Sequence, residues 1–299
     1  MKKILVIGSN GLLGQSIVKK FNRHYEITGC SLEQENYNSV YSFHEYFQLD
    51  ITKRSEVRNF FSHHKPDIII NAAAYTNVDK CEDERKLCWE INVKGVENIL
   101  EVSESFSPVF LQISSDYIFD GSTGPYREID DPKPLGYYGF CKLAAEKLLR
   151  ACGLEYLIIR TAILYGNGYK VRPNYVTWVI NELKHGKKID VVNDQHGNPT
   201  FVDDLSETIY RLLDKDAYGI FHVSGRESCS RYDFALKIAK IFELNSDLIQ
   251  ETTSDKLDQK TPRPMNSSFV LYKLHNTIDW LPSNVEDGLI KLKKQLIAG

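Results

Sequence analysis

Two side chains in the stretch "PLGYYGFCKLAAEKLLR" (134–150) have the types and spacing for acid–base chemistry. Tyr138 and Lys142 lie four residues apart in a segment with helical periodicity, which places them on one helix face. A free phenol has a pKa of about 10, and a nearby ammonium group lowers it by stabilising the phenolate. The pair is therefore predicted to be a proton donor with its electrostatic partner, and the competing interpretation is two ordinary neighbours on a helix.

A third polar group is expected to hold the carbonyl on which such a donor acts. The predicted strand 108–115 ends in Ser114 and Ser115, and Asp116 follows. One of these hydroxyls could share a substrate carbonyl oxygen with Tyr138. Hydride transfer to the carbonyl carbon, with a proton from the phenol, then gives an alcohol.

The hydride source is indicated at the N-terminus, where G-x-x-G-x-x-G follows a short apolar strand and opens a helix. Gly8 allows the tight turn, Gly11 lets the backbone approach a pyrophosphate, and Gly14 lets the helix pack on the sheet. The helix N-terminus then offers free N–H groups to the phosphates. This predicts a dinucleotide site at Gly8, Asn10, Gly11, Leu12, Leu13 and Gly14.

The end of the second strand, 25–30, bears on the choice between NADH and NADPH. An acid at this place binds the ribose 2′-hydroxyl of NAD. Cys30 and Ser31 provide neither an acid nor a base, so we expect NADPH or NADH, with NADPH slightly favoured. Asp50 ends a short third strand and is predicted to accept a hydrogen bond from the adenine, or else to cap the next helix. The predicted cofactor residues also include Ser31, Asp50, Ile51, Tyr138 and Lys142.

Strands alternate with helical segments over the first half of the chain, which predicts an α/β fold with a doubly wound, Rossmann-type parallel sheet. We expect residues 1–168 to form the NAD(P)-binding domain, with a return of about 201–225. Residues 169–200 and 226–299 are expected to form a smaller mixed α/β substrate lobe. In this lobe Arg263 could pair with a nucleotide diphosphate or be a solvated loop arginine, and Asn174 could reach a sugar or phosphate. His196 is interpreted as a hydrogen-bonded loop residue.

Composition excludes several classes of function. The net charge of −3 over 299 residues argues against a nucleic-acid partner. Apolar runs fall short of the ~20 residues of a membrane span, and the N-terminus does not resemble a signal peptide. Six cysteines without a C-x-x-C pair fit reduced thiols in the cytoplasm, and the histidine spacing predicts no metal site.

Several segments together resemble the dTDP-4-dehydrorhamnose reductase family of extended short-chain dehydrogenases/reductases. They follow the family's order over nearly the whole chain: "NAAAYTNVDKCE" (71–82), "ISSDYIFDG" (113–121), "YGFCKLAAE" (138–146), "RTAILYG" (160–166), "NDQHGNPTFVDDL" (193–205) and "TPRPMNS" (261–267). The resemblance implies NAD(P)H-dependent reduction of the C4 keto group of a nucleotide-linked 6-deoxy sugar, most simply dTDP-4-dehydro-L-rhamnose. It also makes a homodimer plausible.

The resemblance assigns roles at matching positions. Tyr138 would donate the proton with Lys142 as its partner, and Ser115 stands where the family has a threonine. Asp116 would touch the sugar, and Tyr117 belongs to the same predicted substrate site with Ser115, Tyr138, Asn174 and Arg263. Ala72, Ala73 and Ala74 would line the cofactor.

One position departs from the family pattern, because Ile163 replaces a tryptophan that lies beside the sugar. Two alternatives stay open at this stage. The first is an NADP-binding regulatory subunit like that of methionine adenosyltransferase. The second is a sugar-nucleotide epimerase or dehydratase, which recycles its cofactor and so would show no net consumption of NAD(P)H.

Overall fold

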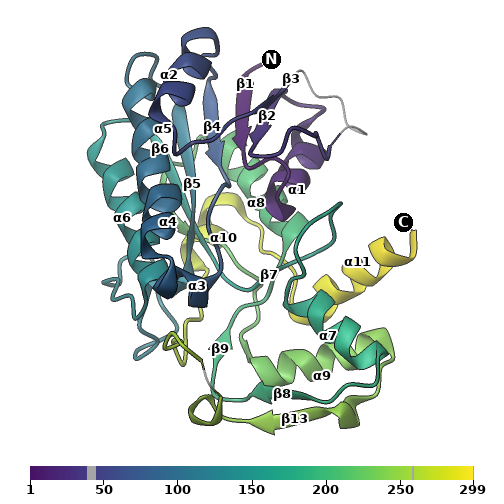
Figure 1. Ribbon diagram of the computed structural model, residues 1–299. Coiled ribbons are helices and arrows are strands. Elements are labelled where there is room, and N and C mark those ends of the chain that lie inside the picture. Colours follow the sequence, from purple (N-terminus) through teal and green to yellow (C-terminus); the bar gives the residue numbers. More distant parts are fainter. Residues whose placement is uncertain (39–44, 258, 299) are drawn as a thin grey trace.

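The computed structural model describes residues 1–38, 45–257 and 259–298. Its centre is a parallel sheet of seven strands within these ranges, in the order β11-β6-β5-β4-β1-β2-β3 (Figure 1). The strands are β1 (Lys3–Ile7), β2 (Glu26–Ser31), β3 (Glu45–Gln48), β4 (Ile68–Asn71), β5 (Val109–Ser115), β6 (Tyr156–Thr161) and β11 (Gly219–His222). This architecture confirms the predicted Rossmann-type α/β fold.

Helices cover both faces of the sheet because the strands are apolar on both faces. In β1, Ile4 and Val6 enter one core while Leu5 and Ile7 enter the other, as the alternation of strand side chains requires. The first core contains residues of α1 (Leu12–Phe21), α8 (Val202–Asp214) and α10 (Tyr272–Ile278). The second contains residues of α2 (Arg54–His63), α5 (Gly95–Ser103) and α6 (Tyr137–Ala151).

A smaller lobe has a core of its own and lies beside the end of the sheet (Figure 1). It is built from α7 (Tyr175–Lys184), α9 (Arg231–Phe242), α11 (Val285–Ala298) and the paired strands β8 (Ile189–Val192) and β13 (Ile249–Thr252). Two further short strand pairs are β7 (Leu164–Tyr165) with β10 (Thr200–Phe201), and β9 (His196–Gly197) with β12 (Cys229–Ser230), the second of which lies within the lobe.

The chain crosses between the two parts several times. Strand β11 pairs with β6 at the edge of the main sheet. Helix α10 lies within the segment that the sequence assigned to the smaller lobe, yet Leu274 and Ile278 pack into the core over the main sheet. These two side chains share that core with residues of α8 and with Phe221 of β11.

The helical stretch that runs from Arg85 to Ser103 has a wider turn in its middle. Here α4 (Arg85–Trp89) leads into a π-helical turn, η1 (Glu90–Lys94), and then into α5. Asn92 in this turn accepts a hydrogen bond from the Tyr75 N–H at 2.9 Å and donates one to the Tyr75 carbonyl at 3.0 Å. The turn thus fixes the backbone just after β4. Helix α3 (Val78–Asp83) and the short helices η2 (Asp116–Ile118), η3 (Ser246–Leu248) and η4 (Ser254–Lys256) complete the described elements.

Candidate active site

The predicted donor, its partner and the serine come from two adjacent elements at the carboxyl end of β5. Tyr138 and Lys142 lie in α6, and Ser115 is the last residue of β5. All three are buried, with 8%, 3% and 6% of their surface exposed. The Lys142 ammonium donates to the Ile113 carbonyl at 2.5 Å, so a strand carbonyl holds the amine beside the end of β5.

A glycine lets helix α6 approach the end of β5 closely. A Cβ added to Gly139, the residue after Tyr138, would clash with the Tyr117 carbonyl group, whose carbon would lie only 2.8 Å away. The Tyr117 and Tyr138 rings meet edge to face with centroids 5.9 Å apart. The Ser115 hydroxyl accepts from the Tyr117 N–H at 3.2 Å, which starts η2 and orients the serine.

The electrostatics of the pair differ from the sequence prediction. Burial raises the pKa of Tyr138, while a hydrogen bond with Ser115 acts in the opposite direction. Burial also lowers the pKa of Lys142 to about 8, against an opposing effect of Glu146. The prediction of a lowered pKa for Tyr138 is therefore wrong for this structure, because desolvation raises the pKa by more than the neighbouring groups lower it. A phenol with a raised pKa stays protonated at neutral pH, as a proton donor must.

Asp116 lies beside this group and is held by hydroxyls. Its carboxylate accepts from Ser115 at 3.1 Å and from Ser267 at 2.6 Å, although Ser267 is distant in the sequence. Burial raises the pKa of Asp116, while the hydrogen bond from Ser267 and the charge of Arg231 act to lower it. The loop that contains Ser267 thus closes over the end of β5.

The glycine turn has the shape that a dinucleotide pyrophosphate needs. Gly8 has a φ of +79°, and a Cβ there would lie 2.7 Å from the Ala73 nitrogen. A Cβ on Gly14 would lie 2.6 Å from the Ser9 Cα and would also clash with the Gly8 carbonyl. Helix α1 begins after Gly11, so its first N–H groups lack partners within the helix. The residues present therefore fit a dinucleotide at this turn.

Other predicted cofactor residues have mainly structural contacts. The Asn10 amide donates to the Glu35 carbonyl at 2.8 Å and accepts from the Tyr37 N–H at 3.0 Å. It also donates to the Glu33 carboxylate at 3.3 Å, so an acid does lie near the glycine turn, two residues beyond the end of β2. Ser31 accepts from the Asn10 N–H at 3.0 Å. These contacts hold the loop after β2 against the turn.

The other predicted cofactor residues are of two kinds: most could face a cofactor only through their backbone or a small side chain, and Asp50 forms a turn. The side chains of Leu13 and Ile51 are buried in the two sheet cores, so only their backbone atoms could face a cofactor. Leu12 and Ala72 are partly buried against the first of these cores, Ala73 against the second, and Ala74 follows at the end of β4. Asp50 accepts from the Thr52 N–H at 3.0 Å, so it closes a turn and does not cap α2, whose cap is Lys53.

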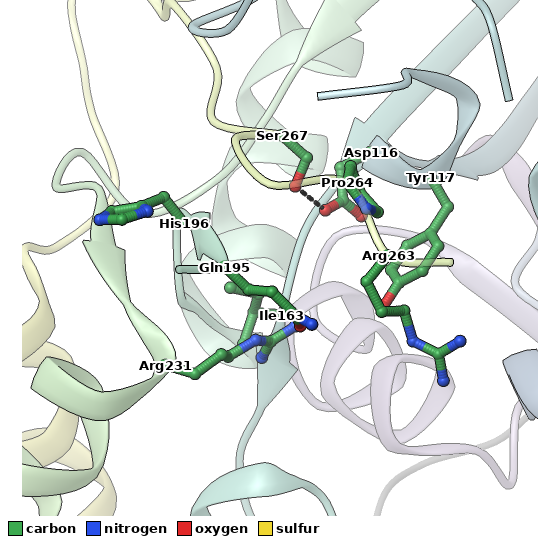
Figure 2. A pocket seen from close by; sticks show the side chains of 9 residues that line it. All are labelled: Asp116, Tyr117, Ile163, Gln195, His196, Arg231, Arg263, Pro264 and Ser267. Carbon is green, nitrogen blue, oxygen red and sulfur yellow. Dashed lines mark hydrogen bonds between the residues drawn. The ribbon is translucent and has the colours of Figure 1, made fainter. Parts of the chain in front are cut away.

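A pocket opens beside Asp116 between the larger part and the lobe (Figure 2). Arg231 and Gln195 reach into it from the lobe side, opposite Asp116 and Ser267. The full lining is Asp116, Tyr117, Ile163, Gln195, His196, Arg231, Arg263, Pro264 and Ser267. The pocket thus brings together three of the residues that were predicted to bind substrate, Asp116, Tyr117 and Arg263, while Ser115 and Tyr138 are not in its lining.

Two predicted substrate residues have different contacts from those expected. Asn174 caps α7 through its side chain and donates to the Gly166 carbonyl at 2.8 Å, and it does not line the described pocket. The Asn174 side chain accepts a hydrogen bond from the Thr177 N–H at the start of α7, so its oxygen is already engaged. Arg263 is neither solvated nor free, since it pairs with Asp79 at 2.7 Å and its side chain is 12% exposed.

The sequence did not predict four polar residues of this pocket: Gln195, His196, Arg231 and Ser267. His196 lies in strand β9 rather than in a loop, and its N–H donates to the Met265 carbonyl at 2.7 Å, which pairs two lobe segments. Arg231 opens α9 directly after the Ser230 cap, so its sequence context predicts only a helix start. Within the described ranges, no group of His, Cys, Asp or Glu side chains could hold a metal, and no helix is long and apolar enough to cross a membrane.

The model of the RmlD substrate binding domain family matches residues 1–297. The chain belongs to this family. A dTDP-4-dehydrorhamnose reductase from Aggregatibacter actinomycetemcomitans is 31% identical over 98% of this chain and 99% of its own length. A Bacillus anthracis dTDP-4-dehydrorhamnose reductase, solved in complex with NADP, is 31% identical with a TM-score of 0.88 over 98% of this chain and 99% of that one.

This RmlD-family chain is also similar to proteins with another role. The methionine adenosyltransferase 2 subunit beta of Xenopus tropicalis is 29% identical over 91% of this chain and 81% of its own length. The Ser115–Tyr138–Lys142 group therefore carries more weight than overall similarity in the choice of function.

Proposed function

We propose that this chain reduces the C4 keto group of dTDP-4-dehydro-L-rhamnose to dTDP-L-rhamnose with NADPH or NADH. The observation that supports the proposal most is the burial of Ser115, Tyr138 and Lys142 where α6 packs on β5, with Asp116, the next residue, lining a pocket between the two parts. The reductases among the family relatives support the same substrate and cofactor. The six cysteines form no disulfide, which supports a cytoplasmic location.

The chain's own residues divide the work of the reduction. The first turn of α1 and the glycine turn would hold the dinucleotide, and the bound nicotinamide supplies the hydride that reaches C4. Ser115 and Tyr138 orient the carbonyl oxygen, and Tyr138 gives it the proton that completes the alcohol. Lys142 stabilises the phenolate left behind. Asp116, held by Ser267, orients a sugar hydroxyl.

A panel of keto-sugar nucleotides tests this function directly. With dTDP-4-dehydro-L-rhamnose we expect one NAD(P)H to be oxidised for each product molecule formed. The loss of absorbance of the reduced cofactor measures this oxidation. The ratio of kcat/KM for NADPH to kcat/KM for NADH measures the cofactor preference. This ratio is of interest because the Glu33 carboxylate lies near the glycine turn, where an acid favours NADH. Product formation without net cofactor consumption would indicate an epimerase or dehydratase instead.

The similarity to a methionine adenosyltransferase subunit supports a second candidate, a cofactor-binding regulatory subunit. It predicts that no keto-sugar nucleotide is reduced and that the chain changes the activity of a methionine adenosyltransferase. The buried donor group argues for the reductase, because a binding subunit needs no proton donor beside the cofactor. A homodimer stays a prediction.

A further inference from the structure

Arg231 brings an unpaired positive charge into the pocket. Its N–H donates to the Gln195 carbonyl at 3.0 Å, and this bond fixes the start of α9 at the pocket wall. Its guanidinium lies 5.3 Å from the centroid of the Tyr175 ring. Over residues 1–38, 45–257 and 259–298, this guanidinium forms no ion pair and donates no hydrogen bond. Its planar set of donors is therefore available to a ligand.

The other pocket arginine is already engaged. The Arg263 guanidinium pairs with Asp79 of α3 at 2.7 Å and donates to the Thr261 carbonyl at 2.8 Å. The Thr261 N–H donates to the same Asp79 at 3.2 Å. Arg263 therefore fastens the loop 260–267 onto α3. These contacts favour a structural role for Arg263, which holds the loop to α3, over the diphosphate-binding role that the sequence predicted for it.

The charges around the pocket favour an anion near Arg231. Asp116 is the carboxyl group in the lining, and its oxygens accept from the Ser115 and Ser267 hydroxyls. The charge of Arg231 also acts on this carboxylate, but among the described residues no hydrogen bond or ion pair joins the two groups. The two guanidinium groups lie on the lobe side and on the loop, so an anionic ligand part would lie between the lobe and the strand ends. A partly desolvated guanidinium gains most from such a partner.

We propose that Arg231 binds the diphosphate of the nucleotide sugar. This inference rests on the proposed function, which supplies the chemical class of the ligand. The sugar must lie against Ser115 and Tyr138 for its carbonyl to react, and a 6-deoxy sugar carries no charge itself. The diphosphate is the anionic part that adjoins the sugar. A guanidinium fork matches two phosphate oxygens at once, which an ammonium group cannot do.

Calorimetric titration of the NADP-loaded protein with dTDP and with dTMP tests the inference. We expect Arg231→Gln to weaken dTDP binding about 10- to 100-fold, as loss of a hydrogen bond to a charged group implies. Arg231→Lys should lie in between, because it keeps the charge and loses the fork. The control Arg150→Gln removes an exposed arginine of α6 and should bind dTDP like the wild type. The dTMP affinity should change much less than the dTDP affinity.

Steady-state rates separate this inference from the proposed function. We expect the KM for the keto-sugar nucleotide to rise in Arg231→Gln while kcat and the KM for NADPH stay close to wild-type values. Unchanged dTDP affinity in both Arg231 variants, or no dTDP binding by the wild type, would overturn the inference. If the wild type binds dTDP through Arg231 and yet reduces no keto sugar, the proposed reaction is wrong and the inference stands.

Discussion

Raising the pH should switch off the reaction near pH 8, because burial lowers the pKa of Lys142 to about 8 from its usual 10.5. The ammonium form must support the phenolate, so activity follows the protonated fraction of the amine. At pH 9 about a tenth of the molecules would keep this proton, against nearly all of them if the pKa were 10.5. The value of kcat/KM should therefore fall about tenfold from pH 7 to pH 9, and a further tenfold by pH 10.

The assay follows NADPH oxidation at low keto-sugar concentration from pH 6 to pH 10, with recovery at pH 7 as the check for unfolding. Lys142→Arg is the matched variant, since its guanidinium keeps the charge throughout this range. Whatever activity it retains should lose the decline near pH 8. A wild-type profile that stays level to pH 9.5, or a decline that persists in Lys142→Arg, would refute the assigned role of Lys142.

Two further predictions concern the scaffold of the site. Gly14→Ala puts a Cβ 2.6 Å from the Ser9 Cα, so we expect a loss of about 1–3 kcal/mol of unfolding free energy, measured by urea titration, and weak NADPH binding. Gly11→Ala meets only the Gly8 carbonyl oxygen at 3.3 Å, so it should weaken NADPH binding with little loss of stability; equal stability losses in the two variants would contradict this account. Glu146→Ala leaves Arg160 buried without its partner, which is 2.8 Å away, and should cost about 3–5 kcal/mol in the same titration.

The parts of the fold that depend on local pattern were predictable from the sequence. The glycine spacing placed the turn at Gly8 and Gly14, where the backbone contacts leave no room for a Cβ. The alternation of strands and helices gave a parallel sheet. The π-helical turn was not predictable. Its Asn92 side chain forms hydrogen bonds with the Tyr75 backbone, and the hydrophobic periodicity of the sequence does not reveal such a contact.

The parts of the site that depend on tertiary contacts were not predictable. Ser267 reaches Asp116 across 151 residues of sequence, and Arg231 enters the pocket only because β12 pairs with β9. The partner of Lys142 is a backbone carbonyl, that of Ile113, which carries no signal in the side-chain pattern. Burial also reversed the expected direction of the Tyr138 pKa shift, since the depth of a side chain is a property of the whole fold.

The turnover of Tyr138→Phe on dTDP-4-dehydro-L-rhamnose tests the central claim most directly, with Tyr137→Phe, the neighbouring tyrosine of α6, as the matched control. The account predicts that kcat falls about 10²- to 10⁴-fold in Tyr138→Phe, as expected for loss of a general acid, while NADPH affinity and the control stay near wild type. Turnover of Tyr138→Phe within a few-fold of the wild type would contradict it.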